Sequence, residues 1–221
     1  MIKSRNNSFF LAIMAPNGWF RLLGGMDFAG GMAVETASGF SSLAVAIALK
    51  KRKRHPSAPV NPPMVVLGGA LLWFGWVGFN AGSEGACNAR ASNAAFNTHF
   101  TACVAASFWL LCDFLRTKKL SSISLINGAV AGMVIITPAA GYIEPASCWA
   151  LGAVAGIVCY FMCLLLKRFV DDSFDAFGVH GVAGFLGLLL TGIFAESNVI
   201  SLDGTVSNGG FINRNWIQLA Y

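Results

Sequence analysis

The chain has 221 residues, of which 56% are hydrophobic and only 11% are charged, whereas a soluble domain carries about 25% charged residues. This composition, with a mean hydropathy of +0.64, excludes an ordinary soluble domain and indicates a polytopic membrane protein. The net charge of +5 comes from basic residues in short clusters between apolar runs. Such clusters are typical of membrane orientation signals and argue against nucleic-acid binding.

The first 24 residues do not predict a complete membrane span. An apolar piece over residues 8–14 is interrupted by Ala15-Pro-Asn-Gly18, and a spanning helix needs roughly 20 apolar residues. We therefore expect residues 1–24 to form a partial or re-entrant segment.

Six longer apolar segments predict an all-α transmembrane bundle of about six full spans. The expected spans are residues 28–49, 63–82, 94–115, 121–142, 148–166 and 176–197. The loops after the first, third and fifth spans hold ten of the fifteen Lys and Arg residues. The positive-inside rule places these loops in the cytoplasm, so the first and sixth spans should cross the membrane in opposite directions.

Two of the expected spans carry related motifs with one ionisable side chain each. Val34-Glu35-Thr-Ala-Ser-Gly-Phe40 aligns with Val179-His180-Gly-Val-Ala-Gly-Phe185, and an aspartate precedes each motif, Asp27 and Asp175. An ionisable group at membrane depth costs a few kcal/mol, so it is a candidate functional group. Because the two helices are antiparallel, they predict an inverted repeat with a substrate site where the helices meet.

A third feature is polar and aromatic. Trp76, Phe79 and Ser83 recur at i, i+3 and i+7 on one face of the second span. Aromatic faces bind small cations and a hydroxyl supplies a directed acceptor. The same spacing fits an interfacial aromatic belt, and spacing alone leaves both interpretations open.

The sequence contains no motif for a cofactor, a metal or a catalytic nucleophile. It has no phosphate-binding glycine loop, no HExxH, no paired Cys/His cluster and no Gly-x-Ser-x-Gly. We expect no cofactor, no metal site and no enzyme activity. Cys87 and Cys148 fall in loops expected on one face of the membrane, which leaves a disulfide between them open.

Four segments, in this order, resemble signature segments of the ammonium transporter family (Amt/Mep/Rh), with fungal ammonium permeases as the most similar branch. They are Asp27-Phe-Ala-Gly-Gly31, Trp76-Val-Gly-Phe-Asn-Ala-Gly-Ser83, Ile136-Thr-Pro-Ala-Ala-Gly141 and Asp175-Ala-Phe-Gly-Val-His-Gly181. The resemblance covers residue 16 onward and implies that residues 1–221 are a partial ammonium transporter domain. Family subunits have eleven spans, so about four N-terminal helices and the last helix are expected to be absent. Residues 198–221 are expected to be the extracellular loop before that last helix.

The resemblance implies a homotrimer in the plasma membrane that moves ammonium or ammonia, with methylammonium as an analogue, through one pore in each subunit. Glu35 stands where most members have the first of two paired pore histidines, a variant found in one branch of fungal permeases. The family motifs assign roles to the following residues: pore and proton relay, Glu35 and His180; substrate recruitment and outer gate, Trp76, Phe79 and Ser83; structural support near the vestibule, Asp27; pore lining, Thr137.

Three other functions remain as alternatives at this stage. The first is an ammonium sensor that binds but conducts little, and the second is an inactive truncated paralogue. The third is an intramembrane aspartyl protease using Asp27 and Asp175, which the topology opposes because it places the two aspartates at opposite membrane faces. Helix capping is the favoured role for both aspartates. The basic run at residues 50–54 is expected to set topology, with contact to anionic lipid as a secondary role.

Overall fold

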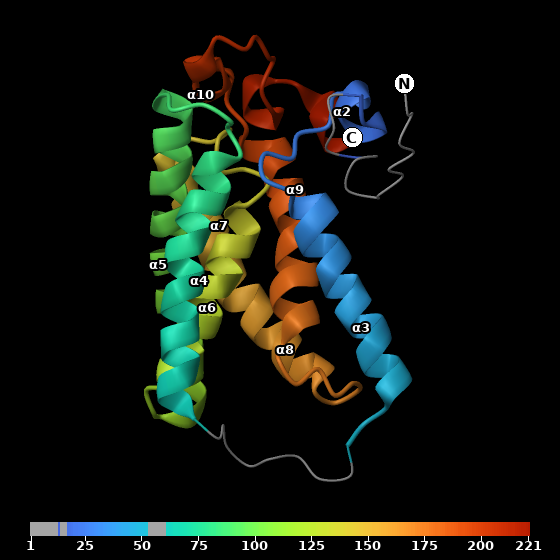
Figure 1. Cartoon of the computed structure of the whole chain (residues 1–221), viewed down its shortest axis with the longest axis vertical. Coiled ribbons are helices and arrows are strands. Elements are labelled where there is room, and N and C mark those ends of the chain that lie inside the picture. The colour runs from blue at the N-terminus through green and yellow to red at the C-terminus, as the bar shows by residue number, and fades with distance from the viewer. Residues whose placement is uncertain (1–12, 14–16, 53–60) are drawn as a thin grey trace, which may run out of the picture.

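The fold is all-α over residues 13, 17–52 and 61–221, the part of the chain that a computed structural model describes (Figure 1). The expectation for residues 1–24 falls largely outside these residues. The elements in order are α2 (Trp19–Leu23), η1 (Gly31–Thr36), α3 (Ala37–Leu49), α4 (Pro62–Gly82), α5 (Ala89–Thr117), α6 (Ser122–Ile136), η2 (Pro145–Ser147), α7 (Cys148–Val154), η3 (Ala155–Cys159), α8 (Tyr160–Leu166), η4 (Phe177–Gly181), α9 (Val182–Phe194), α10 (Ser197–Ile200), η5 (Ser201–Asp203), η6 (Phe211–Asn213) and η7 (Trp216–Leu219).

Five of the six expected spans form helices that are long and apolar enough to cross a membrane, which confirms the predicted fold class. They cover Gly31–Leu49, Pro62–Gly82, Ala89–Thr117, Pro145–Leu166 and Phe177–Phe194. Three of them combine an α-helix with a π-helical turn: η1, η3 and η4.

The sixth apolar segment is shorter than expected, because α6 is 15 residues long and ends at Ile136. Pro138 has no backbone N–H to continue the helix, and the chain turns there. The carbonyl oxygens of Thr137 and Pro138 accept hydrogen bonds from Ala29 N (3.1 Å) and Phe28 N (3.0 Å). The end of α6 is thus tied to the segment that leads into η1.

Small residues let the helices pack closely, as is usual in lipid. A Cβ atom at Gly132 of α6 would lie 2.7 Å from the Thr101 carbonyl oxygen of α5, and one at Gly128 would lie 2.8 Å from Ala106 Cα. In Figure 1, α4, α5 and α6 form one side of the bundle, and α3 and α9 form the other.

The end of α3, the turn between α5 and α6 and the segment after α8 lie at one end of the molecule, called here the basic end (Figure 1). This arrangement matches the alternation predicted from the sequence. At the basic end, Arg52 forms two hydrogen bonds to the Asp171 carboxylate through Nε (2.6 Å) and Nη2 (2.8 Å), and a third to Ser173 Oγ (2.7 Å). This Arg52–Asp171 clasp joins the segment after α3 to the loop before η4.

The opposite end carries the long terminal segment, which contains only short helices between residues 197 and 219. Arg90 at the start of α5 pairs with Glu84 (2.6 Å) and with Asp203 of this segment (2.8 Å). Its guanidinium carbon also lies 5.7 Å from the Phe28 ring centre and 5.8 Å from that of Tyr142. These contacts fasten the terminal segment over the end of the bundle.

The disulfide that the sequence left open does not form, because Cys87 is a free, exposed thiol and Cys148 is a free, buried one.

The inverted repeat is visible in matching hydrogen bonds at the starts of η1 and η4. The Asp27 carboxylate accepts from Gly31 N (2.6 Å) and Met32 N (2.9 Å). The Asp172 carboxylate accepts in the same way from the backbone N–H groups of Ala176 (2.9 Å) and Phe177 (2.8 Å). Each group in the first set lies 145 residues before its counterpart in the second: Asp27 before Asp172, Gly31 before Ala176 and Met32 before Phe177. Glu35 and His180 have the same separation.

The sequence comparison matched Asp27 with Asp175, and this match was wrong. Asp172 holds the equivalent position, whereas Asp175 forms an ion pair with Lys167 (3.0 Å). Asp27 and Asp175 lie at opposite ends of the bundle, since η1 begins far from the basic end and η4 begins near it (Figure 1). That separation argues against an aspartyl protease.

Candidate functional site

Glu35 and His180, predicted from related motifs, are in direct contact. Glu35 Oε2 lies 2.7 Å from His180 Nδ1, and the Glu35 side chain is 4% exposed against 29% for His180. Each residue lies in a π-helical turn, η1 or η4, and such turns are frequent at functional sites. This distance is that of a hydrogen bond, in which the His180 tautomer decides the donor, and it is short enough for a proton to pass between the two side chains.

Glycines let the two backbones come close enough for this contact. A Cβ at Gly39 would clash with the backbone of Gly181, and one at Gly184 would lie 2.9 Å from Glu35 Cβ. Gly39 and Gly184 occupy matching places in the two motifs. Each helix thus supplies the glycine on which the ionisable turn of the other helix rests.

The pair lies in the wall of a wide-open cavity of about 580 Å³ between η1, α3, α4 and η4, where Leu71, Leu72 and Phe79 are exposed. Apart from Glu35, His180 and Ser38, its lining is apolar: Val34, Gly68, Leu71, Leu72, Gly75, Trp76 and Phe79. An apolar cavity with a few converging polar groups is the usual form of a small-ligand site.

Trp76 lies between His180 and Phe79 in this lining. Its ring centre lies 6.1 Å from that of His180 with the planes tilted by 30°, and 5.8 Å from that of Phe79 in an edge-on arrangement. Its indole N–H donates to Thr137 Oγ1 at 2.9 Å. Thr137 is fully buried and donates in turn to the Met133 carbonyl (2.8 Å), so α6 holds the orientation of Trp76.

The predicted site residues divide into three groups by position. Glu35, His180, Trp76 and Phe79 lie together in the cavity wall. Thr137 is behind Trp76, and its hydroxyl reaches the cavity only through the indole. Ser83 and Asp27 lie outside the lining, and Ser83 donates to the Phe79 carbonyl (2.8 Å) at the end of α4.

Sequence reasoning missed Ser38. It lies one helical turn after Glu35, at i+3, and it shares the cavity wall with Glu35. Helical spacing from Glu35 was the signal that could have identified it.

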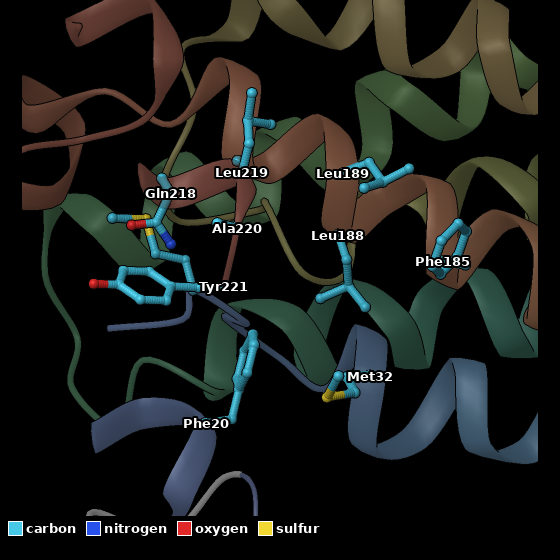
Figure 2. Close-up of a pocket in the computed structure, with 11 residues that line it drawn as sticks. Phe20, Met32, Phe185, Leu188, Leu189, Gln218, Leu219, Ala220 and Tyr221 are labelled. Carbon is cyan, nitrogen blue, oxygen red and sulfur yellow. The ribbon is translucent and has the colours of Figure 1, made fainter. Parts of the chain in front are cut away.

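A second cavity, of about 180 Å³, lies between α2, η1, α9 and the terminal segment (Figure 2). Met32, Phe185, Leu188 and Leu189 line it on one side, and Gln218, Leu219, Ala220 and Tyr221 of the terminal segment also line it. Among the described residues of its lining, none has an acidic, basic or thiol side chain. Among the described residues, no group of three or more His, Cys, Asp or Glu side chains could hold a metal ion.

Relatives of known sequence are ammonium transporters. Ammonium transporter 1 of Schizosaccharomyces pombe is 43% identical over 212 residues, which cover 93% of this chain and 43% of that protein. The chain spans about half the length of the curated relatives it matches.

Solved structures with the same fold include Mep2 of Candida albicans, with a TM-score of 0.89 and 41% identity over 95% of this chain and 48% of that one. A structure titled "Sensor Amt Protein" has a TM-score of 0.79 and 31% identity over 92% of this chain and 51% of that one.

The family profile described as "Ammonium Transporter Family" matches residues 7–221. Since this match includes both ionisable turns, the cavity between them and the terminal segment, the chain belongs to that family.

Proposed function

We propose that the chain forms part of the conduction path of a transporter that moves ammonium or ammonia across a membrane. The observation that carries the proposal is the Glu35–His180 pair in the wall of an otherwise apolar cavity. Family membership and the multi-span helical fold support it.

The chemistry follows from the lining. The aromatic faces of Trp76 and Phe79 attract a small cation, but an apolar cavity cannot replace the water around an ion. Loss of a proton to the Glu35–His180 pair makes passage as neutral ammonia favourable. Glu35 differs from a neutral imidazole at the same place because it can carry a negative charge, which attracts a cation deeper into the cavity. In this proposal Ser83 and Asp27 support the outer end.

The proposed setting extends beyond the described residues. The protein lies in the plasma membrane with its basic end in the cytoplasm and residues 198–221 outside, and it assembles as a homotrimer. The positive-inside rule supports the orientation, and the family resemblance supports the assembly. No step requires a cofactor, a metal or nucleic acid.

The test is uptake of labelled methylammonium by permease-deficient yeast that express the full coding sequence, measured between about pH 4 and pH 8, a range that includes the reference pKa values of model carboxyl and imidazole compounds. Glu35→His should change the pH dependence, because a His–His pair exchanges protons differently from a Glu–His pair. Glu35→Leu and His180→Ala should each lower uptake by about a hundredfold or more, in the range that proton-transfer groups contribute. The double variant Glu35→Leu/His180→Ala should cost less than the two effects added, since the residues act as a unit.

Identical uptake curves for wild type, Glu35→His and Glu35→Leu would reject the proposal that this pair handles a proton. Surface expression of each variant is the control for misfolding.

A sensor that binds ammonium without conducting it is the second candidate, favoured by the similarity to the sensor protein structure. Saturable ammonium binding to purified protein, without uptake in vesicles, would select this function over transport.

A further inference from the structure

The cavity wall contains one hydroxyl whose role the Glu35–His180 pair does not explain. Ser38 is exposed and lines the cavity. Among the described lining residues, the uncharged polar groups are its hydroxyl and the indole N–H of Trp76. The indole N–H is already bonded to Thr137. Ser38 Oγ is therefore the neutral polar atom left available to a ligand in the cavity.

The hydrogen bond that Ser38 makes determines how it can bind. Its Oγ donates to the Glu35 carbonyl oxygen at 2.9 Å. Because a hydroxyl has one hydrogen and two lone pairs, this bond uses the hydrogen and leaves the oxygen as an acceptor. Ser38 thus suits a ligand that donates N–H groups and does not suit one that needs a donor.

Ser38 lies where a ligand that moves along α3 would contact it after the Glu35–His180 pair. The helix axis of α3 runs from Glu35 toward the basic end (Figure 1), and Ser38 lies one turn farther along it. A ligand that leaves the Glu35–His180 pair toward the basic end reaches Ser38 next.

We propose that Ser38 is a further substrate-binding residue, an N–H acceptor that receives ammonia or ammonium beside the Glu35–His180 pair and favours the species with more N–H groups. The inference rests on the proposed transport function and adds a specificity determinant to it. Both ammonia and ammonium donate N–H bonds, and in an apolar cavity each unsatisfied donor is costly. Each methyl group on the nitrogen replaces one donor.

The chain offers a matched control for the test. Ser42 lies one turn farther along α3, and its hydroxyl donates to the Gly39 carbonyl (2.7 Å) in the same i to i−3 pattern. Ser42 does not line the cavity. Ser38→Ala and Ser42→Ala therefore remove the same intrahelical bond, but only Ser38→Ala removes an acceptor from the cavity.

The experiment compares ammonium and methylammonium uptake in wild type, Ser38→Ala, Ser38→Thr and Ser42→Ala, each expressed from the full coding sequence and normalised to surface protein. Ser38→Ala should lower the kcat/KM of ammonium about threefold to tenfold, the usual effect of one hydrogen bond, and should reduce the preference for ammonium over methylammonium. Ser38→Thr keeps the oxygen and should retain the preference, and Ser42→Ala should match wild type.

Two results would overturn the inference while leaving transport intact: an unchanged preference in Ser38→Ala, or equal losses in Ser38→Ala and Ser42→Ala. Absence of uptake by the wild type would reject the transport function and the role of Ser38 together.

Discussion

Thr137 influences the cavity although its own side chain is fully buried. Its hydroxyl accepts from the Trp76 indole, and the Trp76 ring lies against His180 and Phe79. A change at Thr137 should therefore act through the orientation of one ring. The motif that contains Thr137 predicted a pore-lining role, whereas the residue lies behind Trp76 and outside the lining of the cavity.

Replacing Thr137 with Val should lower methylammonium uptake about threefold to tenfold, because the indole N–H of the half-buried Trp76 loses its acceptor. Tryptophan fluorescence should shift in the same variant as the ring leaves its place. Thr137→Ser keeps the oxygen and should preserve both uptake and fluorescence. Normal uptake by Thr137→Val would show that Trp76 holds its orientation without this bond.

At the level of single residues, the sequence predicted contacts better where two motifs could be compared. The matching apolar spans identified Glu35 and His180, and these side chains meet at 2.7 Å. Comparison failed for the aspartates because Asp175 lies nearer His180 in the sequence, whereas the backbone N–H groups that need a cap are bonded to Asp172. The contact of Thr137 with Trp76 joins two different helices, which no local pattern encodes.

Among the structural elements, the crossing of η1–α3 with η4–α9 controls the site. Two glycines remove the side chains that would hold the helices apart, and two capping aspartates fix where each π-helical turn begins. The glycines appear in the sequence as part of the motifs. Hydrophobic patterning does not distinguish a π-helical turn from an α-helix, so the turns could not be predicted.

Gly39→Ala should destabilise the protein by about 1–3 kcal/mol, the usual cost of inserting a methyl group where no space exists. The added Cβ would clash with the Gly181 backbone. Gly78→Ala in α4 is the control, because a Cβ there meets nothing within 4 Å and alanine favours the helix. Thermal unfolding in detergent measures both, and equal melting temperatures would mean that the crossing adjusts without cost.

The apolar segments predicted the helix lengths except where a capping residue or a proline set the end of a helix. The 29-residue α5 is longer than its expected span at both ends. Its earlier start is explained by Asn88, which caps the helix by accepting a hydrogen bond from Ala91 N. The segment expected at residues 121–142 ends as a helix at Ile136, before Pro138, although its apolar character continues. Hydrophobicity predicts which segments enter the membrane, whereas caps and prolines decide where helices end.

Across the whole molecule, the Arg52–Asp171 clasp connects the two halves of the repeat at the basic end. The Arg52 guanidinium holds the pKa of the Asp171 carboxyl well below its usual value of 3.8. A group with a lowered pKa in the folded state contributes stability above its unfolded pKa and loses it as pH falls. The stabilisation should therefore be present at neutral pH and decline below about pH 3.8.

Asp171→Asn should lower the melting temperature at pH 7 and remove that part of the acid dependence, because the amide cannot ionise. Arg52→Gln should have a similar effect at neutral pH, and the double variant should cost no more than either single variant if the pair acts as a unit. The measurement is thermal unfolding in detergent between about pH 3 and pH 7, around the usual carboxyl pKa. Additive losses in the double variant would show that the two residues stabilise the protein independently.

The reciprocal contacts of η1–α3 and η4–α9 also bear on the direction of transport. A glycine of each half packs against the ionisable turn of the other half, and Glu35 and His180 meet where the two helices cross. Turning such a scaffold upside down returns nearly the same framework, so the crossing itself has no built-in preference for inward or outward movement. A passive path carries net flow only down the electrochemical gradient of the substrate. The places where the halves differ, beginning with a carboxylate on one side and an imidazole on the other, can change the rate of that flow but not its direction.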